Sequence, residues 1–522
     1  MAETNRRKWI IMTVVGVFAV YFGSIWFRPL YAPGEVRYGQ MAREMLLSGD
    51  FTTPTLNGLP CMETAKGALG LMAWSMKFLG ETAFAVRFPG ALFTLLTAGL
   101  LLWAGKILFT QRIAWMGALI FSGFLGGYSS YVFVDPQVPG LALTAAFLLF
   151  NLLFAVEKKW LYLAAGSVFL CLGTYLSGGT FFRTGLVPLL YFLWQKQYKA
   201  LPGALTAALA GFLTARIWGT LPAAGLEVRY LPGYPLGLAA GTLPMLLPLL
   251  SACPVLRKKG LIFFQQEKTL LFLLFSLAGL FICSLFSPGN LRGYLWLSYP
   301  LSALLFARCF EEGIQNNGMV GAGKIIYILS FLIGGFALLF IISQYLPFLP
   351  GKYKFFSGAG LVPVAVSVGL VLLWYNMAAK EKNCFPERKF LYFCVGTCVL
   401  MLALPHLIPF KIARHYEKST LIRHALRNRL RPDARLYADR AMAPVAAWTL
   451  KKQVNILETA PLKNEKTAVT WETLGKQITR SPKKQQFVIF TQSAVPRGKI
   501  PARRTVIRSG KTAIIIYGDV MP

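Results

Sequence analysis

Residues 137–156 read "QVPGLALTAAFLLFNLLFAV", twenty residues without a charged side chain. A helix of about 20 apolar residues is what crosses the ~30 Å hydrocarbon core of a bilayer. The whole chain shares this bias, because 55% of its 522 residues are hydrophobic and 14% are charged, against roughly 25% charged residues in soluble domains. A polytopic α-helical membrane protein is therefore predicted.

Comparable apolar runs recur along the chain, and about thirteen of them approach the length of a span. The predicted spans are 9–27, 84–106, 113–133, 137–156, 160–178, 180–195, 201–221, 234–253, 269–286, 291–308, 323–346, 360–378 and 389–409. Residues 1–8 are too short and too polar for a cleaved signal peptide, so we expect the first span to be retained.

The net charge of +33 follows the loops between these spans, a distribution that argues against a nucleic-acid partner. Excess Lys and Arg on alternate loops is the positive-inside pattern and predicts a cytoplasmic N-terminus. An odd number of spans then places the C-terminal segment outside. The basic residues of the inner loops are Arg6, Arg7, Lys8, Lys106, Arg112, Lys158, Lys159, Lys196, Lys199, Arg257, Lys258, Lys259, Lys380, Lys382, Arg388 and Lys389.

The sequence predicts neither a metal centre nor a cofactor. Of its eight Cys residues only Cys61 falls clearly in an outer loop, and no CxxC pair is present. His415 and His424 are nine residues apart, which is not a metal-ligand spacing. No G-x-x-x-x-G-K-[ST] loop supports a nucleotide donor. A divalent ion shared by Glu35, Glu63 and a third ligand remains an alternative.

Two domains are predicted: a membrane domain at 1–410 and a polar tail at 411–522. Helix-like stretches in the tail ("KSTLIRHALRNRL", "MAPVAAWTLKK") alternate with a short apolar run ("ARLYAD"), and two strand-like runs follow ("QFVIFTQ", "TAIIIYGDV"), which indicates a small extracytoplasmic α/β domain. The tail carries 23 Lys and Arg against 7 Asp and Glu. This charge fits either a surface near anionic lipid or a face that binds phosphate.

The first outer loop, residues 28–83, is long and has two helical halves, "GEVRYGQMAREMLLSG" and "KGALGLMAWSMKFLG". Each half has apolar residues at three- and four-residue spacing, and each ends on Gly as a helix cap would. We expect these helices to lie in the interface plane beside the membrane mouth.

Charged residues gather on the predicted outer side of the membrane domain. An ionisable group at membrane depth costs about 2.5–3.5 kcal/mol, so such groups usually serve a function. Acids and cations at one face suggest a site for a phosphate and a hydroxylated group. Snorkelling anchors and local ion pairs are the alternative, although a carboxylate gains nothing from snorkelling. The outer-side candidates are Glu35, Arg37, Glu63, Lys66, Asp135, Arg183, Arg229 and Arg292.

Four segments, in order, resemble one family. "PGEVRYGQMAREMLLSGDFTTPTLNGLP", "ETAFAVRFPGALFTLLTAGLL", "YVFVDPQ" and "LFSPGNLRGYLWLSYPLSALLFA" are similar to conserved segments of the aminoarabinose and protein-mannosyl transferases of the GT-C type. The predicted span count and the outer α/β tail also resemble the aminoarabinose branch.

The resemblance implies transfer of a sugar from a polyprenyl-phosphate carrier, usually with inversion, to a hydroxyl or phosphate on the outer leaflet. It implies membrane lipid as surroundings, an outer-leaflet lipid or envelope glycan as acceptor, and the bacterial inner membrane as location. The chemistry needs a carboxylate and cations for the leaving phosphate. Asp135 and Glu35 are the candidate catalytic acids. The candidate donor-binding residues are Arg37, Tyr38, Glu63, Lys66, Arg183, Arg292 and Tyr294.

Four positions depart from the family pattern. Gly34 stands where the resemblance implies the catalytic Asp of the first loop, and Thr64, Gly178 and Asn290 stand where it implies lysines. Each lost cation weakens phosphate binding by about 1–3 kcal/mol unless another group substitutes. Lys66 and Arg292 are predicted to substitute, with their charged ends near one anion.

Three functions remain open from the sequence. The first is a glycosyltransferase rebuilt around Asp135, Glu35, Lys66 and Arg292. The second is a catalytically silent relative that binds a polyprenyl or lipid A-like ligand or scaffolds a partner transferase. The third is a transporter, which the absence of an inverted repeat and the one-sided charges disfavour.

Overall fold

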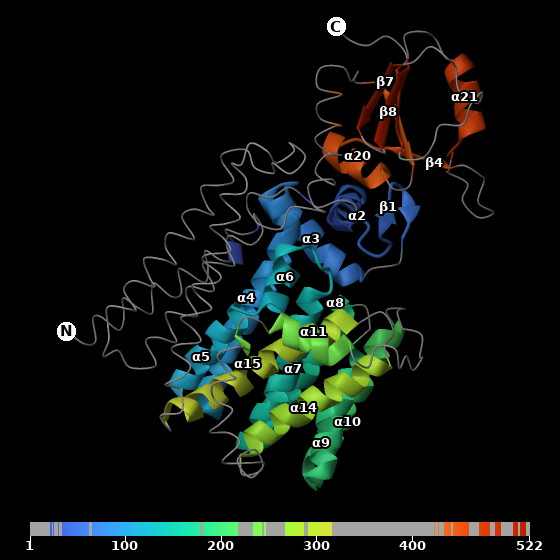
Figure 1. Cartoon of the computed structure of the whole chain (residues 1–522). Helices are drawn as coiled ribbons and strands as arrows, with labels where there is room; N and C mark the ends of the chain where they lie inside the picture. Colours follow the sequence, from blue (N-terminus) through green and yellow to red (C-terminus); the bar gives the residue numbers. More distant parts are fainter. Residues whose placement is uncertain are drawn as a thin grey trace, which may run out of the picture. The chain divides into compact units, whose positions relative to one another are not determined.

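The computed structural model describes residues 21–22, 25, 30, 34–61, 65–177, 181–217, 233–242, 245–246, 267–286, 291–315, 422, 426, 433–439, 442–458, 469–480, 486–491, 505–509 and 512–517. The chain divides into two compact units (Figure 1). The membrane unit comprises Met1–Phe27 and Arg87–Ile408, and the composite unit comprises Arg28–Val86 and Pro409–Pro522. The first loop thus shares a unit with the C-terminal tail.

Helices make up the described part of the membrane unit. Five segments are long and apolar enough to cross a bilayer, which confirms a polytopic helical membrane protein; they are α4 (Ala83–Leu108), α7 (Val138–Glu157), α8 (Trp160–Ser177), Tyr198–Ile217 and α14 (Lys268–Leu285). The others are α5 (Gln111–Ser122), α6 (Leu125–Val132), η1 (Phe182–Gly185), α9 (Leu186–Trp194), η2 (Tyr198–Ala200), α10 (Leu201–Ile217), α11 (Gly233–Gly241) and α15 (Leu291–Gln315).

The predicted span 113–133 is wrong as a single helix, because the chain breaks between α5 and α6. Phe124 lies at the break in an extended conformation and is fully buried. Its ring packs edge-on against Tyr299 at 5.9 Å and Phe306 at 5.8 Å, both on α15. Tertiary burial of this ring therefore overrides a continuous apolar run. The predicted spans 323–346, 360–378 and 389–409, and most of 9–27, lie outside the described residues.

Helix α7 is buried along nearly its whole length and packs closely against α8. The close approach depends on small residues, because a Cβ added at Gly140 would lie 2.6 Å from the Gly173 carbonyl oxygen. A Cβ at Gly173 would lie 2.6 Å from Thr144 Oγ1. Small residues at a crossing are the usual means by which membrane helices pack without a large apolar driving force.

The first loop of the composite unit has the two predicted helices, α2 (Gly34–Ser48) and α3 (Lys66–Leu79), joined through the hairpin β1 (Thr55–Leu56) and β2 (Leu59–Pro60). Gly49 follows α2 with a φ of +71°, and Gly80 follows α3 with a φ of +78°. These left-handed conformations favour glycine, so the prediction of glycine-ended helices is confirmed.

The tail forms a six-stranded sheet, which confirms the small α/β domain. Its strands are β3 (Arg435–Asp439), β4 (Asn455–Glu458), β5 (Val469–Thr470), β6 (Phe487–Thr491), β7 (Thr505–Ser509) and β8 (Thr512–Tyr517), in the order β5-β4-β3-β6-β8-β7. The first four in that order are parallel, and β8 pairs antiparallel with β6 and β7. The sequence predicted neither β5 nor β7.

Two helices cover this sheet. The crossover through α20 (Ala443–Leu450) runs from β3 to β4, whereas the crossover through α21 (Trp471–Arg480) runs back from β5 to β6. Because such crossovers are right-handed, opposite directions place the two helices on opposite faces. Trp471 and Leu474 of α21 pack on one face with Tyr437, Phe487, Ile489 and Ile515.

Candidate functional site

Asp135 lies in the short connection between α6 and α7, where Pro136 follows it. Its half-buried carboxylate accepts a hydrogen bond from the Gln137 N–H at 3.0 Å, and its carbonyl accepts one from the Val138 N–H at 3.2 Å. This is an Asp turn that starts α7. One carboxylate oxygen therefore has a structural role, which any functional assignment has to accommodate.

The electrostatic setting of this acid is unusual for a surface turn. Burial raises the pKa of the Asp135 carboxyl above its ordinary value of 3.8, against the opposing effects of the Gln137 hydrogen bond and the positive charge of Arg292. Arg292 is exposed in the first turn of α15. The charge of one predicted site residue thus acts on another: an exposed guanidinium on a partly buried acid.

Arg183 is at the same end of the membrane unit but is engaged in packing. Its Nη1 donates to the Phe286 carbonyl at 2.9 Å, and Phe286 is the residue that ends α14. Its guanidinium also lies 5.4 Å from the Phe182 ring centre. A cation that binds the last carbonyls of a helix stabilises that helix end. Arg183 therefore holds the C-terminal end of α14.

Tyr294 was predicted to bind the donor, and the structure places it in the core. Its ring is fully buried and packs edge-on against Phe181 at 5.1 Å. Arg216, which the sequence placed inside a span, is the second-last residue of α10 and is exposed. Core packing therefore explains the position of Tyr294, and exposure at a helix end explains how the charge of Arg216 is tolerated.

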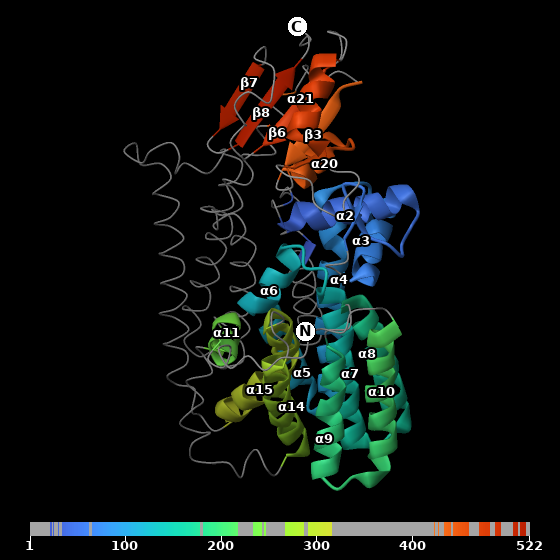
Figure 2. The same cartoon turned by 90° about the vertical axis from the view of Figure 1, so that its right-hand side faces the viewer.

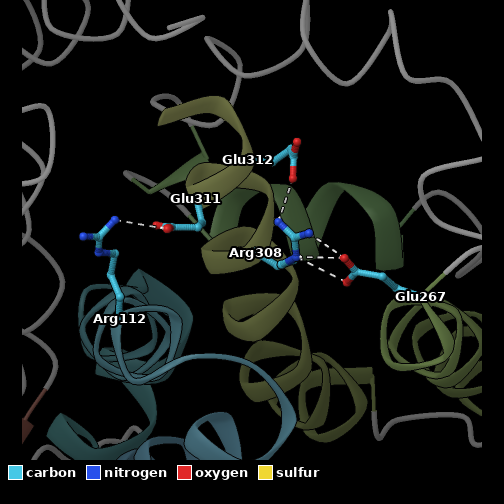
Figure 3. A network of polar contacts seen from close by, with 5 residues as sticks. All are labelled: Arg112, Glu267, Arg308, Glu311 and Glu312. Atoms are coloured by element: carbon cyan, nitrogen blue, oxygen red, sulfur yellow. Dashed lines mark hydrogen bonds and ion pairs between the residues drawn. The ribbon is translucent and has the colours of Figure 1, made fainter. Parts of the chain in front are cut away.

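The opposite end of α15 holds a second charged cluster that the sequence reasoning missed (Figure 3). Arg308 binds Glu267 at the start of α14 and Glu312 one turn further along α15, the latter at 2.8 Å. Arg112 of α5 pairs with Glu311 at 3.2 Å. Glu311 and Glu312 are buried, at 5% and 4% exposure. The signal was present in "ARCFEEG", where three charges close a predicted span.

In the composite unit Glu35 occupies the first turn of α2 and is 3% exposed. A carboxylate there is favoured by the helix dipole. Arg37 Nη2 lies 3.4 Å from Cys61 Sγ, which ties α2 to the end of the β1–β2 hairpin. Tyr38 is half-buried, three residues after Glu35 and so on the same face of α2.

Lys66 is the first residue of α3 and is half-buried. Ala65 precedes it and supplies no side-chain cap for the amides of the first turn. A lysine beside uncapped helix amides is an arrangement that favours an anion. Glu63 and Arg229 lie outside the described residues. Lys66 and Arg292 belong to different units, so their approach to one anion stays a prediction.

Glu44 is a further residue that the sequence reasoning overlooked. Its carboxylate accepts hydrogen bonds from Thr55 Oγ1 at 2.8 Å and from the backbone N–H groups of Asn57 and Gly58 at 2.7 and 3.1 Å. Asn57 and Gly58 both have positive φ, as a tight hairpin turn requires. Glu44 therefore fixes the hairpin that leads to the predicted donor-binding segment 63–66.

Arg87, in the family-like segment "AVRFPG", is also a missed candidate, because it is only 2% exposed near the start of α4. Within the described ranges no three His, Cys, Asp or Glu side chains form a group that could hold a metal ion.

No family model matches the chain. In sequence it is 29% identical over 228 residues to an undecaprenyl phosphate-alpha-4-amino-4-deoxy-L-arabinose arabinosyl transferase 2 of Pseudomonas fluorescens, a match that covers 39% of each chain. A Sodalis glossinidius protein of the same description is 33% identical over 165 residues, or 30% of this chain and 29% of its own length. The matches thus span less than half of these relatives.

The fold comparison extends over almost the whole chain. The crystal structure of ArnT from Cupriavidus metallidurans bound to undecaprenyl phosphate superposes with a TM-score of 0.71 at 17% identity, covering 98% of both chains. The apo state of the same protein gives a TM-score of 0.72. The resemblance predicted from the four segments is confirmed: this chain is a membrane protein with the ArnT fold and is related in sequence to the undecaprenyl phosphate-aminoarabinose arabinosyl transferases.

Proposed function

We propose that the chain is a glycosyltransferase that moves a sugar from a polyprenyl-phosphate carrier to a lipid or envelope-glycan acceptor in the outer leaflet of the bacterial inner membrane. The observation that carries the proposal is the half-buried Asp135 carboxyl, on which the positive charge of Arg292 acts, in a chain of the ArnT fold. The sequence relatives are arabinosyl transferases that use an undecaprenyl-phosphate sugar, which supports this donor class.

The reaction assigns opposite tasks to these two residues. The acceptor oxygen attacks the anomeric carbon, and the bond from that carbon to the phosphate oxygen breaks with its electron pair on the phosphate. Asp135 orients the acceptor hydroxyl and takes its proton, while Arg292 offsets the charge on the departing phosphate. Burial favours the task of Asp135, because its raised pKa makes the carboxylate a stronger base than an exposed one.

The first loop carries further candidate residues for donor binding. Lys66 and the uncapped amides of α3 offer a further anion site, and Glu35 and Arg37 lie on the neighbouring α2. Glu35 is the alternative catalytic acid. Loss of the family lysines is then offset by Lys66 and Arg292. A Lys66→Ala/Arg292→Ala double variant that binds lipid phosphate as well as wild type would remove this part.

A catalytically silent relative that holds the polyprenyl ligand is the second candidate function. Gly34 favours it, since the resemblance places the catalytic Asp at this position. The structure makes this candidate testable: Gly34 is exposed at the start of α2, and a Cβ added there has nothing within 4 Å. An Asp at this point is sterically free and is favoured by the helix dipole.

The test uses full-length protein in nanodiscs with an undecaprenyl-phosphate aminoarabinose donor, and it measures loss of donor. Wild type, Asp135→Asn, Glu35→Gln and Gly34→Asp are compared. We expect wild type to consume donor and Asp135→Asn to lose most of that rate. Full rate in Asp135→Asn contradicts the assignment of this acid. An inert wild type with an active Gly34→Asp variant establishes the silent relative instead.

A further inference from the structure

Helix α20 of the tail is apolar on all sides. It reads "APVAAWTL", and its first six residues are all buried. A helix that is apolar all round needs cover on both faces. The sheet covers one face, and both views show α2 along the other, within the composite unit (Figure 2). The tail thus uses a helix of the first loop to complete its own core.

The contact between α2 and α20 is close. A Cβ added at Gly39 of α2 would lie 2.7 Å from Leu30 Cδ1 and 3.3 Å from the Trp448 ring of α20. The Trp448 ring also carries the ammonium of Lys451, 3.6 Å from its centre. A side chain at position 39 would thus require Leu30 to move and the Trp448 ring to shift by a few tenths of an ångström.

Three charged side chains join the same two segments. Arg43 of α2 binds Glu81 at 2.6 Å and donates to the Lys451 carbonyl at 3.2 Å. The Lys451 ammonium reaches the Glu81 carbonyl at 3.1 Å and the Glu81 carboxylate at 3.4 Å. Lys451 ends α20 with a φ of +55°, so a left-handed residue presents both its carbonyl and its ammonium to the first loop.

The charge balance at Glu81 fits this arrangement. Partial burial acts to raise the pKa of the Glu81 carboxyl, but Arg43 and Lys451 outweigh it and hold that pKa below its ordinary value of 4.5. The carboxylate is therefore ionised and shared by one cation from the loop and one from the tail.

We propose that the C-terminal domain is a positioning element for the proposed donor site, and that Lys451 acts through Glu81 and Arg43 to hold α2. The residues positioned in this way are Glu35 and Arg37, about two turns before Arg43 on the same helix. The expected effect on catalysis rests on the proposed function, whereas the proposal that Lys451 holds α2 in place does not.

The test measures backbone amide hydrogen exchange in full-length protein in nanodiscs. Lys451→Asn removes the ammonium and keeps a residue that tolerates the left-handed backbone. Lys158→Asn is the matched control, because Lys158 ends α7 with a φ of +60° and contacts Gln197 instead. We expect exchange across residues 34–61 to rise about tenfold in Lys451→Asn, to stay unchanged in Lys158→Asn, and to be restored in Lys451→Arg.

Unchanged exchange at 34–61 in Lys451→Asn overturns the proposal. Equal acceleration in β3 and β6 also overturns it, because that would show a general loss of the fold. Donor consumption is a separate measurement: if wild type is active, kcat of Lys451→Asn falls about tenfold with the pH profile unshifted. If wild type consumes no donor, the proposed function fails and the exchange result still decides the positioning role.

Discussion

The two ends of α15 carry arginines in contrasting settings. At the C-terminal end, Arg308 is shared by Glu267 and Glu312, and Arg112 reaches Glu311 (Figure 3). At the N-terminal end, roughly 24 Å away along the helix, Arg292 is exposed, and burial raises the pKa of the nearby Asp135 carboxyl.

This difference separates an arginine that stabilises the fold, Arg308, from one that is proposed to act in the reaction, Arg292. Arg308 binds two carboxylates and links α14 to α15, so its ion pairs stabilise the packing of these two helices. Burial acts on the Asp135 carboxyl more strongly than the charge of Arg292 does, so the pKa of this carboxyl is raised. Two arginines of one helix can therefore differ in their surroundings. Arg308 is neutralised by carboxylates that it contacts, whereas Arg292 is exposed.

The largest expected effect is on turnover in Asp135→Asn. Asn keeps the acceptor oxygen for the Gln137 N–H but cannot take a proton, so the rate should fall about 10²–10⁴-fold. In wild type the base must be ionised, so kcat/KM should fall as pH drops through a pKa above 3.8. That acid limb should be absent from the residual activity of Asp135→Asn; its persistence would assign the titration to another group.

Next in size is the stability cost of Arg308→Met. Removing this guanidinium leaves the buried Glu312 carboxylate without its ion pair, a loss of about 3 kcal/mol. This loss of stability is measured by thermal unfolding in detergent, followed by intrinsic tryptophan fluorescence. An Arg308→Met/Glu312→Leu double variant should recover part of the loss; equal instability in both variants would contradict the ion-pair explanation.

A smaller effect is expected for Arg292→Ala. If this exposed cation binds the donor phosphate as proposed, its loss should raise the donor KM about 10- to 100-fold, equivalent to about 1–3 kcal/mol, and leave the melting temperature unchanged. Arg216→Ala serves as control, because this arginine is also exposed at a helix end. Comparable KM changes in the two variants would indicate a general charge effect.

The smallest effect is expected for Arg112→Met. The Arg112 side chain is 49% exposed, so solvent screens its pair with Glu311 and the unfolding free energy should change by at most about 1 kcal/mol. A loss as large as that of Arg308→Met would show that exposure does not separate the two pairs.

Local signals in the sequence predicted much of this fold. Gly49 and Gly80 end α2 and α3 as expected, and the apolar runs at α4, α7, α8 and α14 are helices long enough to span. Phe124 could not be predicted, because the ring that breaks the span is held by residues of α15. Strands β5 and β7 were not predicted because they are short: β5 has two residues, and β7 has the five residues "TVIRS".

The candidate site shows the same division. The sequence identified Asp135 and Arg292 by residue type and predicted depth, and the charge of Arg292 acts on the Asp135 carboxyl. Arg183 and Tyr294 had the same signature, yet they bind a helix end and pack in the core. Glu81 and Lys451 carried no signal, because their contact joins positions 370 residues apart.

The two parts of the composite unit are synthesised at different times. About 400 residues separate the end of α2 from the start of α20, and at ribosomal rates of about 5–20 residues per second the second helix follows roughly 20–80 s after the first. Throughout that interval the Gly39 face of α2 lacks its contact with Trp448 of α20, while the intervening membrane helices are inserted. The first loop is thus made early and matures last, so a nascent chain stalled before α20 should be a target for quality-control proteases.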